Sequence, residues 1–281
     1  MLKAFSRPVV EEIRPHARRF IQEALDAAGA KGTVEYVAEV CRKIPARVIL
    51  RQFGIDDDAV PRLHRWSIVI NSLGNINTPP ELLDECERTL LEMRELFMVE
   101  IQKRRLHPTG DFISALVTAN EEGDKLCDEE ILGVCYVTLI AGHDTTANTI
   151  ALSTVALAQH PEAREFLREN PARTGDAILE LMRYVSMSTT LARVALEDFD
   201  WNGRTIRKGQ LLFVFQGAGN RDPKVFADPE KLDMNRPQTS NLAFAPGMHR
   251  EGPVRRADDG GRQPRPSRLF ESGNAGHCTQ E

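Results

Sequence analysis

Residues 141–149, AGHDTTANT, interrupt the longest apolar helical pattern of this chain. The flanking runs, ILGVCYVTLIA at 131–141 and IALSTVALA at 150–158, are apolar enough for a helix buried on almost all sides. A glycine inside a helix costs about 1 kcal/mol relative to alanine, and Asp and Thr side chains compete for backbone hydrogen bonds. Such a conflict in a buried helix is typical of a functional site, often as a bulge that opens a groove. The alternative is that the helix breaks at Gly142 and that Asp144 caps a second helix.

The surrounding sequence predicts a mainly α protein with a minor β portion. Apolar residues at helical spacing favour one helical stretch that stops at Gly29, with Pro15 opening a new helix inside it. A second helix is expected between a cap at Thr33 and an end at Gly54. Further helices are expected from Asp56 onward and over 82–107, 112–117, 128–160, 162–169 and 176–184. Short apolar runs separated by turn signals predict a small sheet over 193–215, followed by loops over 216–247.

Composition narrows the class of protein. The chain has 281 residues, 41% hydrophobic and 27% charged, with a formal net charge of −5, as expected of a soluble globular protein. The charge gives no indication of a nucleic-acid or polybasic membrane interaction. No apolar run is long enough to span a bilayer, and the first residues lack the features of a signal peptide. We therefore expect a cytoplasmic protein without a nucleic-acid or membrane partner.

Two further motifs carry little information when each is taken alone. Glu180 and Arg183 lie three apart on a predicted helix, where most such pairs are solvated surface contacts. The run FAPGMHR at 244–250 contains a Pro-Gly turn between apolar and basic residues. Their order along the chain is more informative than either motif.

The order of the motifs along the chain resembles that of the cytochrome P-450 family. A polar interruption in a long helix is followed by Glu-x-x-Arg, then by strands, and then by NRDP, a downstream arginine and Phe-x-Pro-Gly. The resemblance covers almost everything from Met1 to Arg250. It implies a cytochrome P-450-like fold that is incomplete at both ends, with a partial domain over 1–250. The segment 251–281 has few hydrophobic residues and many Arg, Gly and Pro, so we expect a disordered tail outside the family pattern.

The resemblance implies roles for residues of the long helix. Ala141 and Gly142 would form the groove over the heme where oxygen binds. Asp144 and Thr145 would be the catalytic acid–alcohol pair that delivers protons while the O–O bond breaks.

It also implies roles for residues after this helix. Glu180, Arg183 and Arg236 would form a buried charge network that fixes the loop of the iron ligand, since two guanidinium groups can saturate a buried carboxylate. The remaining residues are expected near the cofactor: Arg193 at a heme propionate, Phe244 and Gly247 in the ligand loop, and His249 or Arg250 at the other propionate.

The sequence departs from the family where the iron ligand is expected. The pattern F-x-x-G-x-x-x-C-x-G places the cysteine at position 251, which is Glu251, so the protein ligand of the heme iron is missing. The thiolate matters because it supplies electron density that favours O–O cleavage. Cys278 comes too late, in the expected disordered tail. We expect a reading-frame shift or a sequence error after Arg250, and a chain truncated at its N-terminus by an internal start codon.

The activity implied is that of an oxidoreductase, a monooxygenase that inserts one oxygen atom from O2 into a small organic substrate. Electrons would come from a ferredoxin-type donor, because no nicotinamide-binding motif such as GxGxxG is present. The alternative is a non-catalytic remnant, either an unstable product or a helical interaction protein, which the missing cysteine favours. An unrelated helical protein with coincidental motifs is the third possibility.

Overall fold

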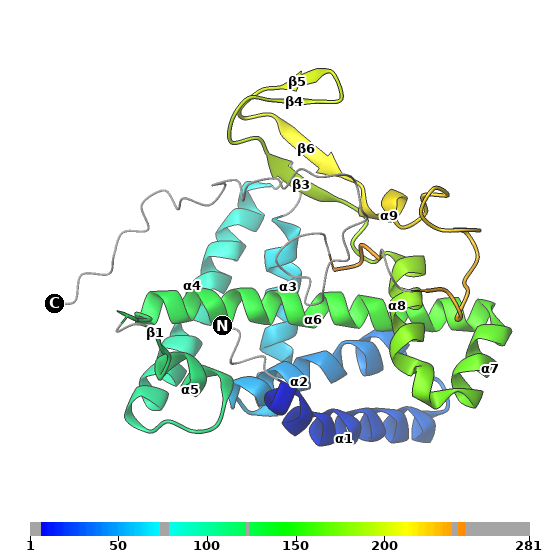
Figure 1. Cartoon of the computed structure of the whole chain (residues 1–281). Helices are drawn as coiled ribbons and strands as arrows, with labels where there is room; N and C mark the ends of the chain where they lie inside the picture. Colours follow the sequence, from blue (N-terminus) through cyan, green and yellow to red (C-terminus); the bar gives the residue numbers. More distant parts are fainter. Residues whose placement is uncertain (1–6, 74–78, 122–123, 238–240, 245–281) are drawn as a thin grey trace. The chain divides into compact units, whose positions relative to one another are not determined.

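A computed structural model describes residues 7–73, 79–121, 124–237 and 241–244 of the chain (Figure 1). The fold is mainly helical with a few short strands, which confirms the expected class. The expected tail at 251–281 lies outside the described residues. No helix within the described ranges is long and apolar enough to cross a bilayer.

The elements follow one another in the expected order. The α-helices are α1 (Arg7–Lys31), α2 (Lys43–Phe53), α3 (Val60–Ser72), α4 (Pro80–Leu106), α5 (Phe112–Val117), α6 (Asp128–Gln159), α7 (Pro161–Glu169), α8 (Thr174–Val185) and α9 (Gln216–Gly219). Shorter helical turns are η2 (Val37–Cys41), η3 (Asp57–Ala59) and η4 (Pro171–Arg173). The strands are β1 (Asn120–Glu121), β2 (Asp124–Lys125), β3 (Leu191–Val194), β4 (Phe199–Trp201), β5 (Arg204–Ile206) and β6 (Leu211–Val214).

The sheet expected over 193–215 is present as two separate antiparallel pairs. Strands β3 and β6 pair with Arg193 opposite Leu212, and β4 and β5 form a hairpin. The hairpin turns at Asn202 and Gly203, whose φ angles of 49° and 75° are the positive values that a tight two-residue turn requires.

Helix α6 is continuous through the AGHDTTANT stretch, so the expected bulge at Gly142 and the alternative break there are both wrong. The polar side chains are accommodated inside the helix. The hydroxyls of Thr145, Thr146 and Thr149 donate to the carbonyl oxygens four residues earlier, at 2.7, 2.9 and 2.8 Å. A backbone carbonyl oxygen has two lone pairs, so it can accept from a hydroxyl and from its helical N–H together, and the helix continues through these residues. The N-cap is Cys127 rather than Asp128, and its N–H donates to the Glu130 carboxylate.

Helix α6 joins two hydrophobic clusters. Its first half, including Ile131, Cys135 and Leu139, packs with apolar residues of α2, α3, α4 and α5. Near its other end, Ala156 packs with apolar residues of α7 and α8. Figure 1 shows α6 as one long rod that reaches both groups of helices. The polar stretch therefore lies between the parts of α6 that pack in the two hydrophobic clusters.

Two expectations for the first helices are wrong. Pro15 lies inside the single helix α1, where its side chain is exposed. Proline has no N–H to donate to the carbonyl four residues earlier, and on this exposed side of the helix water can hydrate that carbonyl. Thr33 is not a cap: the next helical turn has Tyr36 as its N-cap residue, and the Ala38 N–H in its first turn donates to the Glu35 carboxylate. Gly54 does end α2, with a left-handed φ of 68°.

Gly54→Ala is expected to lower the free energy of unfolding by about 1–3 kcal/mol, because a left-handed φ strains any L side chain. A Cβ at this position would also lie 2.2 Å from the Asp111 Oδ2 atom. Urea unfolding followed by circular dichroism measures the change. Gly29→Ala is the control: Gly29 lies within α1 with open space around it, so alanine should raise the stability by up to about 1 kcal/mol. Equal effects of the two substitutions would contradict a special backbone requirement at Gly54.

Candidate functional site

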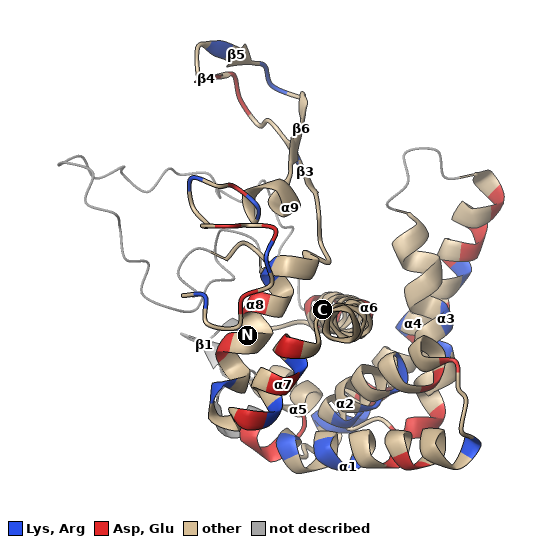
Figure 2. Cartoon of the chain, turned by 90° about the vertical axis from the view of Figure 1, so that its right-hand side faces the viewer, with Lys and Arg blue, Asp and Glu red and all other residues tan. Residues whose placement is uncertain are grey.

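One face of α6 is exposed over most of its length. Its exposed side chains recur every three or four residues, at Val137, Ala141, Thr145, Asn148 and Leu152, with Val137 exposed to 65%. Residues at this spacing lie on one side of a helix. Apart from its first turn, the helix has a single charged residue in Asp144, and Figure 2 shows α6 almost without acidic or basic positions while α1 carries both. The exposed face is therefore uncharged and has small residues at its centre.

The two residues expected to form an oxygen-binding groove lie on different sides of α6. Ala141 is on the exposed face. Gly142 faces α2, where a Cβ atom would lie 2.4 Å from Ile49 Cδ1. Glycine at 142 thus lets α6 approach α2 closely, which is a packing role that the sequence pattern did not reveal.

Asp144 and Thr145 also leave the helix in different directions. Thr145 is on the exposed face, with its hydroxyl bonded to the Ala141 carbonyl. Asp144 turns toward α3, where Asn71 Nδ2 donates to its Oδ2 atom at 2.5 Å. No hydrogen bond joins the two side chains in the described part of the chain. The structure therefore places the expected acid and alcohol on adjacent residues without bringing them into contact.

His143 is a site residue that the sequence motifs did not reveal. Its side chain is fully buried between Asp144 and α3, where Nδ1 lies 3.0 Å from Ser67 Oγ. Its other nitrogen, Nε2, lies 3.2 Å from the Arg42 carbonyl oxygen. Burial lowers the pKa of His143 below its ordinary value, although the neighbouring Asp144 carboxylate acts to raise it. A single histidine within this polar stretch has no local signal that would have identified its buried environment.

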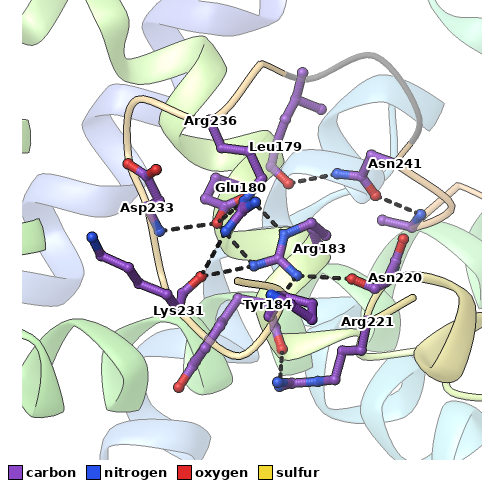
Figure 3. A network of polar contacts seen from close by, with 12 residues as sticks. Leu179, Glu180, Arg183, Tyr184, Asn220, Arg221, Lys231, Asp233, Arg236 and Asn241 are labelled. Carbon is purple, nitrogen blue, oxygen red and sulfur yellow. Dashed lines mark hydrogen bonds and ion pairs between the residues drawn. The ribbon is translucent and has the colours of Figure 1, made fainter. Parts of the chain in front are cut away.

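Glu180 and Arg183 form a fully buried, bidentate ion pair on α8 (Figure 3). Arg183 Nε and Nη2 donate to the two carboxylate oxygens at 2.8 and 2.9 Å. Its remaining N–H groups donate to the carbonyl oxygens of Asn220, Pro229 and Lys231, at 2.8, 2.9 and 3.0 Å. All five donors of the guanidinium group are therefore used, and three of them hold the chain that follows the strands.

Arg236 completes the network. Its Nε atom donates to Glu180 Oε1 at 3.1 Å, and Nη2 donates to the carbonyls of Asp228 and Lys231. The N–H of Asp233 also donates to Glu180 Oε1, at 3.0 Å. The structure thus brings together all three residues that were expected to form a charge network.

The pKa of Glu180 is lowered. Burial by itself acts to raise this pKa, but hydrogen bonds from Arg183, the Asp233 N–H and Arg236 outweigh it. The carboxylate therefore stays ionised inside the protein, where removing either charged partner would leave an unpaired buried charge.

The segment 241–243 is held by amide side chains close to this network. Asn241 Nδ2 donates to the Leu179 carbonyl, and the Leu242 N–H donates to Asn220 Oδ1 at 2.8 Å. Gln216 Nε2 donates to the Leu242 carbonyl at 2.9 Å. These amides orient the backbone up to Ala243, and no local sequence pattern singled them out.

The remaining expected site residues are less constrained. Arg193 lies on β3 with an exposed side chain, and its Nη1 atom donates to the carbonyl of the preceding residue. Phe244 is exposed. Gly247, His249, Arg250 and Glu251, where the iron ligand was expected, lie outside the described residues.

Glu180→Gln is expected to lower the free energy of unfolding by about 3–5 kcal/mol, because it leaves two buried guanidinium groups without a carboxylate. The chain offers a matched control in Glu165→Gln. Glu165 and Arg168 form a pair with the same three-residue spacing on α7, but their side chains are 47% and 78% exposed. The control should be nearly neutral in urea unfolding. Similar losses of unfolding free energy in both variants would show that the buried network stabilises the protein no more than an exposed ion pair does.

The same carboxylate gives a prediction for acid stability. Because the pKa of Glu180 is lower in the folded state, its contribution is complete above the unfolded value of about 4.3 and is lost as the pH falls through the folded value. Stability measured from pH 7 down to pH 3 should therefore fall more steeply below about pH 4.3 in the wild type than in Glu180→Gln. Parallel curves would contradict this assignment.

Comparison with known proteins identifies the family. A family profile described as Cytochrome P450 matches residues 80–249. Among curated proteins, the biotin biosynthesis cytochrome P450 of Bacillus subtilis is 34% identical over 246 residues, which are 88% of this chain and 62% of that protein. The mycinamicin IV hydroxylase/epoxidase of Micromonospora griseorubida is 34% identical over 252 residues, 89% of this chain and 62% of that protein. The chain thus spans about three fifths of the length of these relatives.

Solved structures show the same fold. The structure of P450BioI with a fatty-acyl-loaded acyl carrier protein has a TM-score of 0.80 at 33% identity, covering 87% of this chain and 63% of that one. The polyketide synthase cytochrome P450 PksS of Bacillus subtilis has a TM-score of 0.81 at 29% identity, covering 88% and 63%. The buried Glu-Arg-Arg network, the long central helix and these matches agree, and the chain belongs to the cytochrome P450 family.

Proposed function

We propose that residues 1–250 belong to the domain of a heme monooxygenase that inserts one oxygen atom from O2 into a small organic substrate. The observation that carries this proposal is the exposed face of α6, with Ala141 and Thr145 at its centre and Asp144 beside it. The buried network of Glu180, Arg183 and Arg236 adds support, since it holds the chain that leads to Phe244.

The described residues fit a heme group. A porphyrin is flat and largely apolar and carries carboxylate groups at one edge. The α6 face offers small side chains at Ala141 and Thr145 and apolar ones at Val137 and Leu152. Arg193 has no carboxylate partner among the residues that the structure describes, so it is available for a propionate. The expected position of the iron ligand lies outside the described residues.

When bound, heme supplies an iron that activates O2 with electrons from a donor protein. The residues of this chain would then control protons and water. Thr145 offers a hydroxyl on the exposed face of α6, and Asp144 is a partly buried carboxylate one residue earlier. In the proposed reaction, Thr145 gives the proton of its hydroxyl on the exposed face and Asp144 takes up protons on the α3 side. Because no hydrogen bond joins the two side chains, protons would pass between them through water.

The charge network has a positioning role in this proposal. Glu180 and Arg183 hold α8, and their partners Asn220, Lys231 and Arg236 hold the segment after the strands. The backbone up to Ala243 would thereby be held by buried ionic hydrogen bonds rather than left as a free loop, which is the kind of support that a catalytic site requires.

We also propose a ferredoxin-type electron donor, and a cytoplasmic location that is supported by the similarity to bacterial cytochromes P450. The chain contains no nicotinamide-binding motif such as GxGxxG, which favours electrons supplied by another protein. Relatives named as hydroxylases, such as the 6-deoxyerythronolide B hydroxylase of Saccharopolyspora erythraea, support a small organic substrate.

The alternative of a non-catalytic protein rests on Glu251 at the position expected for the cysteine. Heme loading distinguishes the two. The full chain and its Glu251→Cys variant are expressed with heme precursor, reduced and treated with carbon monoxide. Both are expected to bind heme, and the cysteine variant should gain the red-shifted Soret band of a thiolate-ligated iron. Failure of both proteins to bind heme would contradict the proposed function.

Neighbouring threonines give a matched test of the proton pathway. In the heme-loaded chain with an electron donor, Thr145→Val should reduce product formed per electron by on the order of 10²-fold, because it removes a proton donor from the exposed face. Thr146→Val removes an equivalent hydroxyl, which donates to the Gly142 carbonyl in the same way, and should have little effect. Product and donor oxidation are measured together, and equal losses in both variants would contradict the role of Thr145.

A further inference from the structure

The contact between α3 and α6 determines where the Asp144 carboxylate lies. Asn71, near the end of α3, donates from its side-chain amide to Asp144 Oδ2. Among the described residues it is the only hydrogen-bond donor to this carboxylate. Asp144 Oδ1 lies 3.3 Å from His143 Nδ1, which forms an ion pair only if the ring is protonated.

The protonation state of His143 follows from its other partners. Nε2 lies 3.2 Å from the Arg42 carbonyl oxygen, which can only accept, so Nε2 carries a proton. In the neutral ring Nδ1 is then an acceptor, and the Ser67 hydroxyl donates to it at 3.0 Å. In this state the single lone pair of Nδ1 is used by Ser67 and the nitrogen has no proton to give, so no hydrogen bond joins it to Asp144 Oδ1.

The surrounding groups disfavour a charged ring. His143 is fully buried, and burial is the main cause of its lowered pKa. From α3, His64 packs edge-on against it with ring centroids 6.0 Å apart, and before α2 the Arg42 guanidinium lies close to His64. His64 and Arg42 both act to lower the pKa of His143, and Asp144 alone acts to raise it among these charged groups. A change in the position of the Asp144 carboxylate would therefore change the pKa of His143.

We propose that Asn71 and His143 are positioning residues for Asp144. The Asn71 amide draws the carboxylate toward α3, and the neutral imidazole, occupied by Ser67 and the Arg42 carbonyl, leaves it free of an ion pair. Asp144 can then exchange protons in the reaction proposed above, on which this inference rests.

Removing the amide tests the placement without any cofactor. In Asn71→Leu the carboxylate loses its anchor and can turn to the ring, so the pKa of His143, followed by ¹⁵N NMR of its imidazole in the full chain, should rise by about one unit. Asn71 is exposed, so this substitution should not prevent folding. The double variant Asn71→Leu/Asp144→Asn should abolish the rise, because no carboxylate remains to pair with the ring.

Ser72→Ala is the matched control on α3, since its hydroxyl donates to the Val69 carbonyl and not toward Asp144. It should leave the pKa of His143 unchanged. An unchanged pKa in Asn71→Leu, or a rise that persists in the double variant, would overturn the proposal. Asn71→Asp provides a second, isosteric variant, in which an added carboxylate should also raise this pKa.

A second measurement connects the placement with the reaction. In the heme-loaded chain with an electron donor, Asn71→Leu should lower turnover about tenfold at neutral pH, with KM unchanged and a larger solvent isotope effect, because proton delivery becomes limiting. Unchanged turnover alongside a raised pKa of His143 would overturn the positioning role. A wild-type chain that binds heme but shows no turnover would contradict the proposed function, and the NMR result would still decide where Asn71 holds the carboxylate.

Discussion

The buried carboxylate of Glu180 is the interaction on which the second half of the structure depends. It can stay ionised inside the protein only because Arg183, Arg236 and the Asp233 N–H saturate its oxygens. The two guanidinium groups in turn hold backbone carbonyls of the loop region that follows the strands. A segment without regular secondary structure is thereby given one conformation by ionic hydrogen bonds, which are stronger than neutral ones and fixed in direction.

Helix α6 supplies the other constraint, because it belongs to two hydrophobic clusters at once. Each cluster fixes one end of the helix, and the polar stretch between them does not have to contribute to either core. This arrangement lets the middle of the helix carry Asp144 and several threonines without loss of helical structure. One side of that middle section is buried through Gly142 and His143, and the opposite side presents Thr145.

The two constraints are linked through α8, which packs on α6 and carries the Glu180–Arg183 pair. The loop region is therefore positioned, through α8, against α6, the helix that carries Asp144 and Thr145. On the far side of α6, α3 contributes Asn71 and Ser67 to the environment of Asp144 and His143. The candidate site is thus assembled from helices distant in sequence, each held by its own packing.

The sequence by itself determined the order of most helices, the small β portion and the family, because apolar periodicity and ordered motifs are local properties. It did not determine the bounds of the first helices. The family resemblance grouped Glu180 with Arg183 and Arg236, but spacing alone did not distinguish Glu180–Arg183 from the exposed Glu165–Arg168. Tertiary structure decided which pair is buried, that α6 continues through Gly142, and that His143 and Asn71 surround Asp144. The physical reason is that burial and hydrogen bonds to carbonyls tens of residues away depend on how helices pack, which no local pattern encodes.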